Sequence, residues 1–323
     1  MKVLVIGASG AIGTRLVPQL IERGHEVIGT FNSPGGGDSL RRLGASPVAL
    51  DVLDARAVRQ AVRDAEPDAV IHQATALGNI KFGRNLDRTF TETNRLRIEG
   101  TDALLAAARE GAVPRFLAQS FASYRYAREG GSVKTEDDPD DAMPPATMRQ
   151  TSAAIHHLEE AVTRDGGIVL RYGGFYGASN DGLIKPVRKR QLPIVGDGGG
   201  MFSFIHLDDA ARATVLALEH DGPAVFNIVD DEPAPVREWL PVLAHALGAK
   251  PPRRVPRWLA RLVAGEANTV MATEARGASN AKAKRELGWT PRYASWREGF
   301  VAVYASSRQR AGQFGQEAPG YTG

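Results

Sequence analysis

The chain has 323 residues, enough for one large domain or two interleaved ones. Its 40 basic and 37 acidic residues nearly balance, so we expect no nucleic-acid partner. It contains no cysteine, which excludes disulfides, thiolate nucleophiles and zinc–thiolate centres, and we expect no metal site. A predicted strand begins at Lys2 with no signal peptide before it, and no apolar run is long enough to span a membrane. We therefore expect a soluble, cytoplasmic protein that does not bind membranes.

Strand and helix patterns alternate along the first half of the chain. The apolar run Val3–Ile6 predicts a strand buried on both faces of a parallel sheet, and a predicted helix follows from Ala11 to Arg23. The pattern continues with predicted strands at 25–30, 47–50, 69–72, 115–120 and 168–171, and with predicted helices at 55–64, 89–110 and 147–163. This order predicts an α/β fold with a doubly wound parallel sheet of the Rossmann type.

The composition changes after Tyr172, where glycine and proline become frequent. We interpret residues 1–172, together with about 201–230, as a dinucleotide-binding Rossmann domain. Residues from about 173 to 200 and from 231 to 305 then form a smaller C-terminal lobe that binds the substrate. Residues 309–323 are expected to be a flexible tail.

A glycine-rich segment joins the first predicted strand to the first predicted helix, with the sequence Gly7-Ala8-Ser9-Gly10-Ala11-Ile12-Gly13. Gly7 permits a tight turn, Gly10 lets a pyrophosphate approach the backbone, and Gly13 allows close packing of helix on strand. The helix N-terminus offers N–H groups and a partial positive charge to phosphates. A turn without a ligand is the alternative, but the position at the first junction of a βαβ pattern favours a dinucleotide site.

The spacing of these glycines resembles that of the short-chain dehydrogenase/reductase superfamily, in its extended, epimerase/dehydratase-like branch. Other segments resemble the same family in the same order, among them 51–54, 72–76, 94–108, 170–177, 204–209 and 287–291. The resemblance covers residues 1 to about 305 and implies a nicotinamide cofactor. Besides the three glycines, it implies contacts to that cofactor from Ser9, Ala11, Ile12, Asp51, Val52, Gln73, Ala74 and Thr75.

The end of the second predicted strand bears on the choice of cofactor. An acidic residue there binds the ribose 2′-hydroxyl of NAD, whereas neutral or basic residues tolerate the 2′-phosphate of NADP. This chain has Asn32 and Ser33, with no carboxylate before Asp38. Arg41 or Arg42 would reach the 2′-phosphate of NADP. The alternative is that both arginines only form a solvated face of a helix. The pattern favours NADP, with NAD as the alternative.

The family's proton-transfer pair is missing from this chain. Its members use a Tyr and a Lys four residues apart on the helix after the fifth strand, and the Tyr transfers the proton of the carbinol oxygen. Alignment on that helix puts Met148 at the Tyr position and Ser152 at the Lys position, and no Tyr-x-x-x-Lys occurs anywhere in the chain. The chain therefore resembles the atypical members of the family.

Three hydroxyl groups are our candidates for catalysis. Ser120 ends the fifth predicted strand, near the family's serine, and Tyr124 follows on the loop after it, while Tyr176 resembles a family tyrosine that lines the nicotinamide end of the pocket. Each of them would equally well serve packing alone. An arginine or histidine on the helix, from Arg149, His156 and His157, is a further candidate for the cleft.

The substrate is not expected to be a nucleotide sugar. Family members that act on these carry an arginine four residues before the His of the Ile-His motif, where this chain has Phe202. We therefore predict an NAD(P)-dependent oxidoreductase for a small, fairly apolar carbonyl or alkene-type metabolite, with a non-standard proton donor. The alternatives are a non-redox isomerase or cyclase on the same fold, and a non-catalytic NADP-binding sensor. Apolar faces at 95–110 and 150–163 are compatible with a homodimer and equally with burial in the core.

Overall fold

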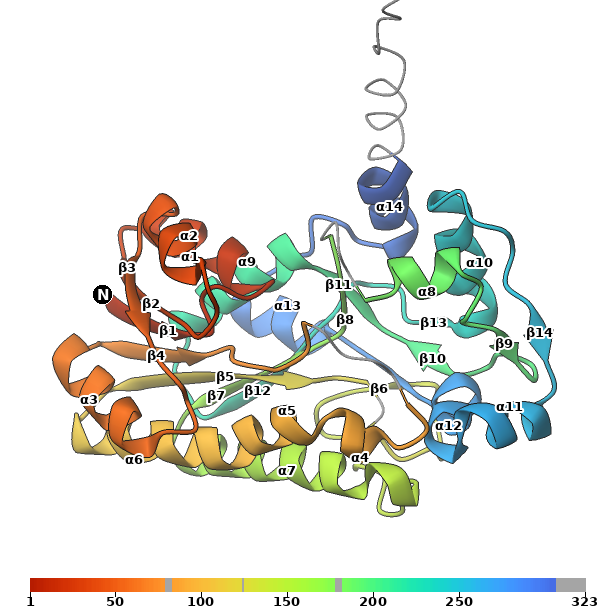
Figure 1. The fold of residues 1–323 in the computed structure, drawn as a ribbon, viewed down its shortest axis with the longest axis horizontal. Helices are drawn as coiled ribbons and strands as arrows, with labels where there is room; N and C mark the ends of the chain where they lie inside the picture. Colours follow the sequence, from red (N-terminus) through yellow and green to blue (C-terminus); the bar gives the residue numbers. More distant parts are fainter. Residues whose placement is uncertain (79–82, 124, 178–181, 306–323) are drawn as a thin grey trace, which may run out of the picture.

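A computed structural model describes residues 1–78, 83–123, 125–177 and 182–305. Seven parallel strands form one sheet in the order β12-β7-β5-β4-β1-β2-β3 (Figure 1). They are β1 (Lys2–Ile6), β2 (Glu26–Phe31), β3 (Ser46–Ala49), β4 (Ala69–His72), β5 (Arg115–Phe121), β7 (Ile168–Tyr172) and β12 (Ala224–Ile228). The predicted doubly wound Rossmann fold is confirmed. The order reverses beside β1, and ligands of such sheets bind at this point, beyond the carboxyl ends of the strands.

Helices cover both faces of the sheet (Figure 1). One layer contains α1 (Gly13–Glu22), α2 (Gly36–Arg42), α9 (Leu207–Leu218) and α13 (Ala281–Leu287). The other contains α3 (Ala55–Ala65), α5 (Thr91–Arg95), α6 (Thr101–Glu110) and α7 (Arg149–Arg164). Alternate residues of β1 enter opposite cores, with Val3 and Val5 on one side and Leu4 and Ile6 on the other. This two-sided burial explains why the strand is a continuous apolar run.

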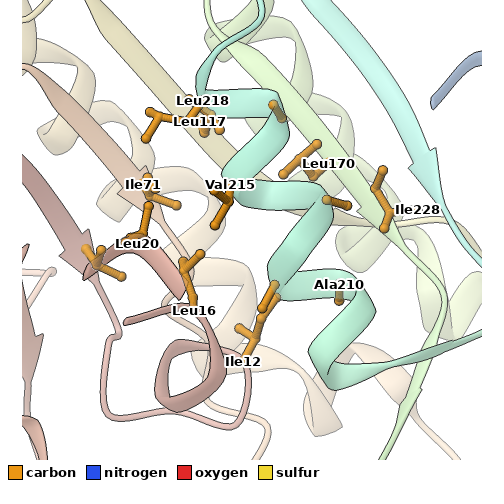
Figure 2. Close-up of a cluster of buried hydrophobic side chains, with 14 of the residues drawn as sticks. Ile12, Leu16, Leu20, Ile71, Leu117, Leu170, Ala210, Val215, Leu218 and Ile228 are labelled. Atoms are coloured by element: carbon orange, nitrogen blue, oxygen red, sulfur yellow. The ribbon is translucent and has the colours of Figure 1, made fainter. Parts of the chain in front are cut away.

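The core beneath α1 and α9 fixes the helix that carries the glycine-rich loop. Figure 2 shows Leu16 and Leu20 of α1 and Val215 of α9 lying over the strands, next to Ile71 and other apolar side chains. The residues Leu16, Leu20 and Ile71 are fully buried. Each such side chain contributes about 1.5–3 kcal/mol when it is buried, so the start of α1 is held firmly against the sheet.

The predicted long helix at 89–110 is divided in the structure. It consists of α4 (Leu86–Thr89), α5, a π-helical turn η1 (Leu96–Gly100) and α6. Gly100 ends the π turn, and a Cβ at this position would lie 2.9 Å from Val52 Cγ1. The hydrophobic pattern did not predict this change of helix type, and both η1 and α6 contact α7.

The C-terminal part forms a second cluster of short elements (Figure 1). Its helices are α8 (Ile184–Arg188), α10 (Val236–Ala246), α11 (Arg257–Ala264), α12 (Glu266–Glu274) and α14 (Trp296–Phe300), which leads into a π turn η3 (Val301–Ala305). Its strands are β8 (Gly174–Tyr176), β9 (Ile194–Val195), β10 (Met201–Phe202), β11 (Phe204–His206), β13 (Ala234–Pro235), β14 (Arg254–Val255) and β15 (Gly277–Ala278). An aromatic core of Tyr176, Phe204, Trp239, Trp296 and Phe300 holds them together.

The two parts of the molecule are joined through several elements. Strand β6 (Val133–Lys134), from the segment after β5, pairs with β15. Helix α13 and Trp289, which we expected in the lobe, pack into the core beneath α1 and α9. The lobe is therefore tied to the sheet on two sides. No helix among the described residues is both long and apolar enough to cross a membrane.

Candidate functional site

The glycine-rich loop leaves β1 at the point where the strand order reverses. Gly7 has a φ of +80°, and a Cβ on it would lie 2.9 Å from the backbone nitrogen of Ala74. A Cβ on Gly13 would lie 2.4 Å from the carbonyl oxygen of Ala8. Ser9 is half-buried and the outer edge at Gly10 and Ala11 is exposed. Only glycine fits the inner positions, and the exposed edge before α1 fits a dinucleotide pyrophosphate.

The residues expected at the adenine end line the same edge of the sheet. The carboxylate of Asp51 is exposed and accepts a hydrogen bond from the Leu53 backbone N–H at 3.0 Å. Val52 is buried against Gly100, and Ile12 is buried under the loop. These positions fit a wall for the base and its ribose.

The residues after β4 continue this wall. The Gln73 side-chain amide donates to the Tyr172 hydroxyl at 3.2 Å, while Ala74 lies against Gly7 and Thr75 is half-buried. Burial lowers the pKa of His72 to about 4, so this imidazole is neutral at physiological pH. Gln73, Ala74 and Thr75 therefore add no charge to this wall.

The turn after β2 has no free carboxylate among its described residues. Asn32 and Ser33 are exposed. The first acid, Asp38, is held by Arg41, whose Nη1 lies 2.8 Å from Asp38 Oδ1. The ring of Phe31 packs against Gly36 and leaves no room for a Cβ there. The turn therefore offers neutral polar groups at the position where NAD-specific proteins present an acid.

A buried carboxylate, Glu159 of α7, organises the carboxyl end of β5. It accepts hydrogen bonds from Arg171 of β7, with Nη2 at 2.7 Å from Oε2, and from Arg125. Arg125 also forms a two-pronged pair with Asp140, at 2.7 and 2.6 Å. Burial by itself would raise the pKa of Glu159, but the guanidinium groups of Arg125 and Arg171 outweigh it and hold the pKa below its ordinary value. The sequence analysis missed this network, although Arg171 in an otherwise apolar strand was a signal for a buried ion pair.

Ser120 belongs to the same network. Its hydroxyl donates to Oε1 of Glu159, and the residue is only 6% exposed. Our second candidate, Tyr124, lies outside the described residues. Tyr126, two positions on, donates from its hydroxyl to Asn227 Oδ1 at 2.8 Å.

Tyr176 lies inside the aromatic core of the lobe. Its ring contacts those of His206 and Phe300, and a Cβ on Gly299 would overlap its hydroxyl. The hydroxyl has no hydrogen-bond partner among the described residues, and burial raises the pKa of Tyr176 well above its usual range. Ser120 therefore belongs to the ion-pair network of α7 and Tyr176 to the aromatic core of the lobe, and both residues are buried.

The start of α7 carries no titratable hydroxyl at the positions aligned with the family pair. Met148 is buried against Leu86 and Ala267. Thr151 donates to Asp87 Oδ1 at 2.8 Å and accepts from Asn94 at 3.1 Å. The two adjacent histidines have different partners. His156 pairs with Asp140 near Ser152, whereas His157 pairs with Asp102 of α6. The described part of the chain holds no cluster of acids and histidines arranged for a metal ion.

A pocket lies between the segment after β5 and α12. Its cavity volume is about 20 Å³, which is room for a water-sized molecule. Tyr126 and Met148 line it from the sheet side, and Val270 and Met271 line it from α12. Charged side chains line it as well, and at this size it does not by itself mark a substrate site.

Comparison with known proteins decides the family. The NAD dependent epimerase/dehydratase family matches residues 3–229. The chain belongs to this family. It is an NAD(P)-dependent enzyme of the extended short-chain dehydrogenase/reductase type, and a nicotinamide cofactor fits its glycine loop.

Relatives within the family include reductases and epimerases. The chain is 41% identical over 308 residues to "3-diazoavenalumate denitrifying reductase" of a Streptomyces species, covering 93% of this chain and 99% of that protein. It is 28% identical over 263 residues to "2-alkyl-3-oxoalkanoate reductase" of Stenotrophomonas maltophilia (strain K279a), covering 77% and 76%. UDP-glucose 4-epimerase of Thermotoga maritima, solved with UDP-glucose, has the same fold, with a TM-score of 0.76 at 23% identity over 96% of this chain and 100% of that one.

Replacing Gly7 by alanine is expected to weaken dinucleotide binding at least about tenfold, because the new Cβ strikes the backbone at Ala74 and displaces the loop. NADPH fluorescence titration measures this. Gly24→Ala is the matched control, since Gly24 has a φ of +79° and no neighbour within 4 Å of a new Cβ. Equal affinities of the two variants would contradict the assignment of the loop.

Asp230, directly after β12, should make stability depend on pH. It is 1% exposed, its Oδ2 has no partner among the described residues, and burial raises its pKa to about 8. The folded state therefore keeps a proton that the unfolded chain releases near pH 4, so stability should fall as pH rises from about 4 to about 8. In Asp230→Asn the thermal midpoint of unfolding should fall less as the pH rises. Asp221→Asn, which changes an exposed side chain, should leave this pH dependence as in wild type. Identical pH profiles for wild type and Asp230→Asn would refute this.

Proposed function

We propose that this enzyme is an NADPH-dependent reductase that transfers hydride to a small conjugated or aromatic diazo compound, which then loses N2. The proposal rests on the candidate catalytic residues near the carboxyl end of β5. None of those candidates that the structure describes offers a free proton donor. The 41%-identical relative, named a denitrifying reductase of a diazo compound, supports the same reaction type.

Carbonyl reduction needs a proton donor. Hydride addition to a C=O group leaves an alkoxide, and the family's Tyr and Lys supply its proton. In this chain Ser120 donates to Glu159, Thr151 donates to Asp87, and Tyr176 lies in the lobe core. The hydroxyl groups of Ser120 and Thr151 donate to protein carboxylates, and that of Tyr176 is enclosed by side chains. This arrangement argues against reduction of a carbonyl group.

Diazo reduction avoids this requirement. A bound reduced nicotinamide supplies hydride. The hydride forms a C–H bond at the ring carbon that carries the diazonium group, and the C–N bond at that carbon breaks with its electron pair leaving on N2, so the products are the arene and N2. The balance is one diazonium and one hydride for one arene and one N2, with no proton consumed and no oxyanion formed. A site with no proton relay is sufficient for this reaction.

The chain's own residues then have positioning roles. The loop Gly7–Gly13 binds the pyrophosphate. Asn32 and Ser33 face the ribose 2′-phosphate. Ser120 and Tyr176 are assigned structural parts, and no role is proposed for Tyr124.

The reaction is tested with diazotised 4-aminocinnamate and NADPH. We expect enzyme-dependent oxidation of NADPH with one N2 and one cinnamate formed for each NADPH, and deuterium transfer to the ring from [4-²H]NADPH. The rate should be nearly independent of pH between 6 and 8, since no donor titrates. The matched substrate is 4-formylcinnamate, expected to react at least about a hundredfold more slowly in kcat/KM. The Gly7→Ala variant corrects for direct reaction in solution.

Three results would reject the proposal. The aldehyde could react as fast as the diazonium, which would indicate a carbonyl reductase with an unrecognised donor. NADPH could bind without any turnover, as for a sensor. Substrate could be converted with no net oxidation of NADPH, as for an isomerase or cyclase.

Cofactor preference has its own test. NADPH should bind more tightly than NADH, and Asn32→Asp should weaken NADPH binding at least about tenfold, because the new carboxylate repels the 2′-phosphate. NADH affinity should change little. Ser46→Asp, exposed at the amino end of β3, adds the same charge at the opposite edge of the sheet and serves as control. An unchanged NADPH-to-NADH ratio in Asn32→Asp would contradict the preference.

A further inference from the structure

Helix α11 turns a row of large apolar side chains toward solvent. The helix lies at the outer edge of the lobe, beside α12 (Figure 1). Trp258, Leu262 and Val263 are 66%, 62% and 68% exposed, and Leu259 beside them is 36% exposed. The side of the helix that packs against the protein carries the small Ala260, which is buried. A surface helix usually buries its large apolar residues and exposes its polar ones, so α11 has the reverse arrangement.

These four apolar side chains form one continuous row. Positions 258 and 262 are one helical turn apart, as are positions 259 and 263, so the two pairs lie next to each other on one side of the helix. Adjoining apolar side chains on a protein surface are typical of a site that contacts another molecule or a membrane. We call the row Trp258, Leu259, Leu262 and Val263 the α11 face.

The chain that leads into and through α11 is strongly basic. Lysine and arginine occupy five positions between 250 and 261, and no Asp or Glu occurs from 250 to 265. Two of the five, Arg257 and Arg261, pair with glutamates of α12. The other three are exposed and have no carboxylate partner among the described residues, namely Lys250, Arg253 and Arg254. The α11 face therefore adjoins positive charge that the protein does not neutralise.

Apolar side chains next to unpaired cations match the surface of a bilayer that contains anionic phospholipids. A tryptophan ring is favourable at the level of the headgroups, aliphatic side chains reach the acyl boundary, and Lys and Arg attract the phosphates. A second copy of this chain fits less well, because a symmetric contact through the α11 face would bring the unpaired cations of both copies together. We propose that α11 docks the protein on an anionic phospholipid surface, with the α11 face inserted and residues 250–254 at the headgroups.

This attachment lies on the bilayer and does not span it. Our expectation that the chain does not bind membranes rested on the absence of a long apolar run, and a helix that lies in the interface does not need one. The proposal is independent of the reaction proposed above, because it involves neither the glycine loop nor the candidate catalytic residues.

Tryptophan fluorescence reports the contact directly. The chain has four tryptophans, and the three besides Trp258 are at most 3% exposed. Vesicles of phosphatidylglycerol and phosphatidylcholine in equal amounts should therefore shift the emission of Trp258 to shorter wavelength, whereas vesicles of phosphatidylcholine alone should leave it unchanged. Trp258→Phe should lose the shift and still sediment with the mixed vesicles, because phenylalanine keeps an aromatic ring at this position.

Co-sedimentation of the full chain with the mixed vesicles tests the apolar contribution. Leu262→Ala should weaken binding at least about fivefold, because it removes buried apolar surface from the contact. The matched control is Ile98→Ala, which shortens an exposed side chain of the same size on η1, in the helical layer of the Rossmann domain. Both variants should keep the thermal midpoint of the wild type, since both change exposed side chains.

The same assay tests the electrostatic contribution. The double variant Arg253→Gln/Arg254→Gln should weaken binding at least about tenfold, and added NaCl should weaken wild-type binding in the same direction. Arg56→Gln/Arg63→Gln on α3 is the matched control, because it removes two exposed arginines from the opposite end of the molecule (Figure 1).

Four results would overturn the proposal. The mixed vesicles could fail to retain the wild-type protein, or phosphatidylcholine alone could retain it equally well. The control variants could lose as much affinity as the α11 variants. Light scattering could show a dimer that Leu262→Ala dissociates, which would assign the α11 face to a second copy of the chain.

Discussion

The buried carboxylate of Glu159 is the constraint on which the site depends. Two guanidinium groups and one hydroxyl, from Arg171, Arg125 and Ser120, converge on it from β7, from the segment after β5 and from β5 itself. A buried charge that loses a partner typically costs about 3–5 kcal/mol, so these contacts hold α7 in one position against the sheet. The same contacts engage the proton of the Ser120 hydroxyl, the group whose sequence position suggested a proton donor.

The fold and the glycine loop were predictable because their signals are local. Four consecutive apolar residues predict that β1 is buried on both faces. The loop requires glycine at positions that its own backbone conformation determines. The roles of Ser120 and Tyr176 were not predictable in this way. Glu159 lies 39 residues from Ser120, and the core around Tyr176 is closed by Phe300, more than a hundred residues away.

Two buried acids show how surroundings set ionisation in this protein. Glu159 and Asp230 are both removed from water, but Glu159 has two guanidinium groups as partners, whereas the groups near Asp230 that influence it are other acids, Glu232 and Asp231. The first is charged at neutral pH and the second holds a proton. Glu159 therefore organises its neighbours through charge, and Asp230 is accommodated among aromatic side chains as a neutral group. At pH 7 Asp230 therefore holds a proton that it can donate, whereas Glu159 does not.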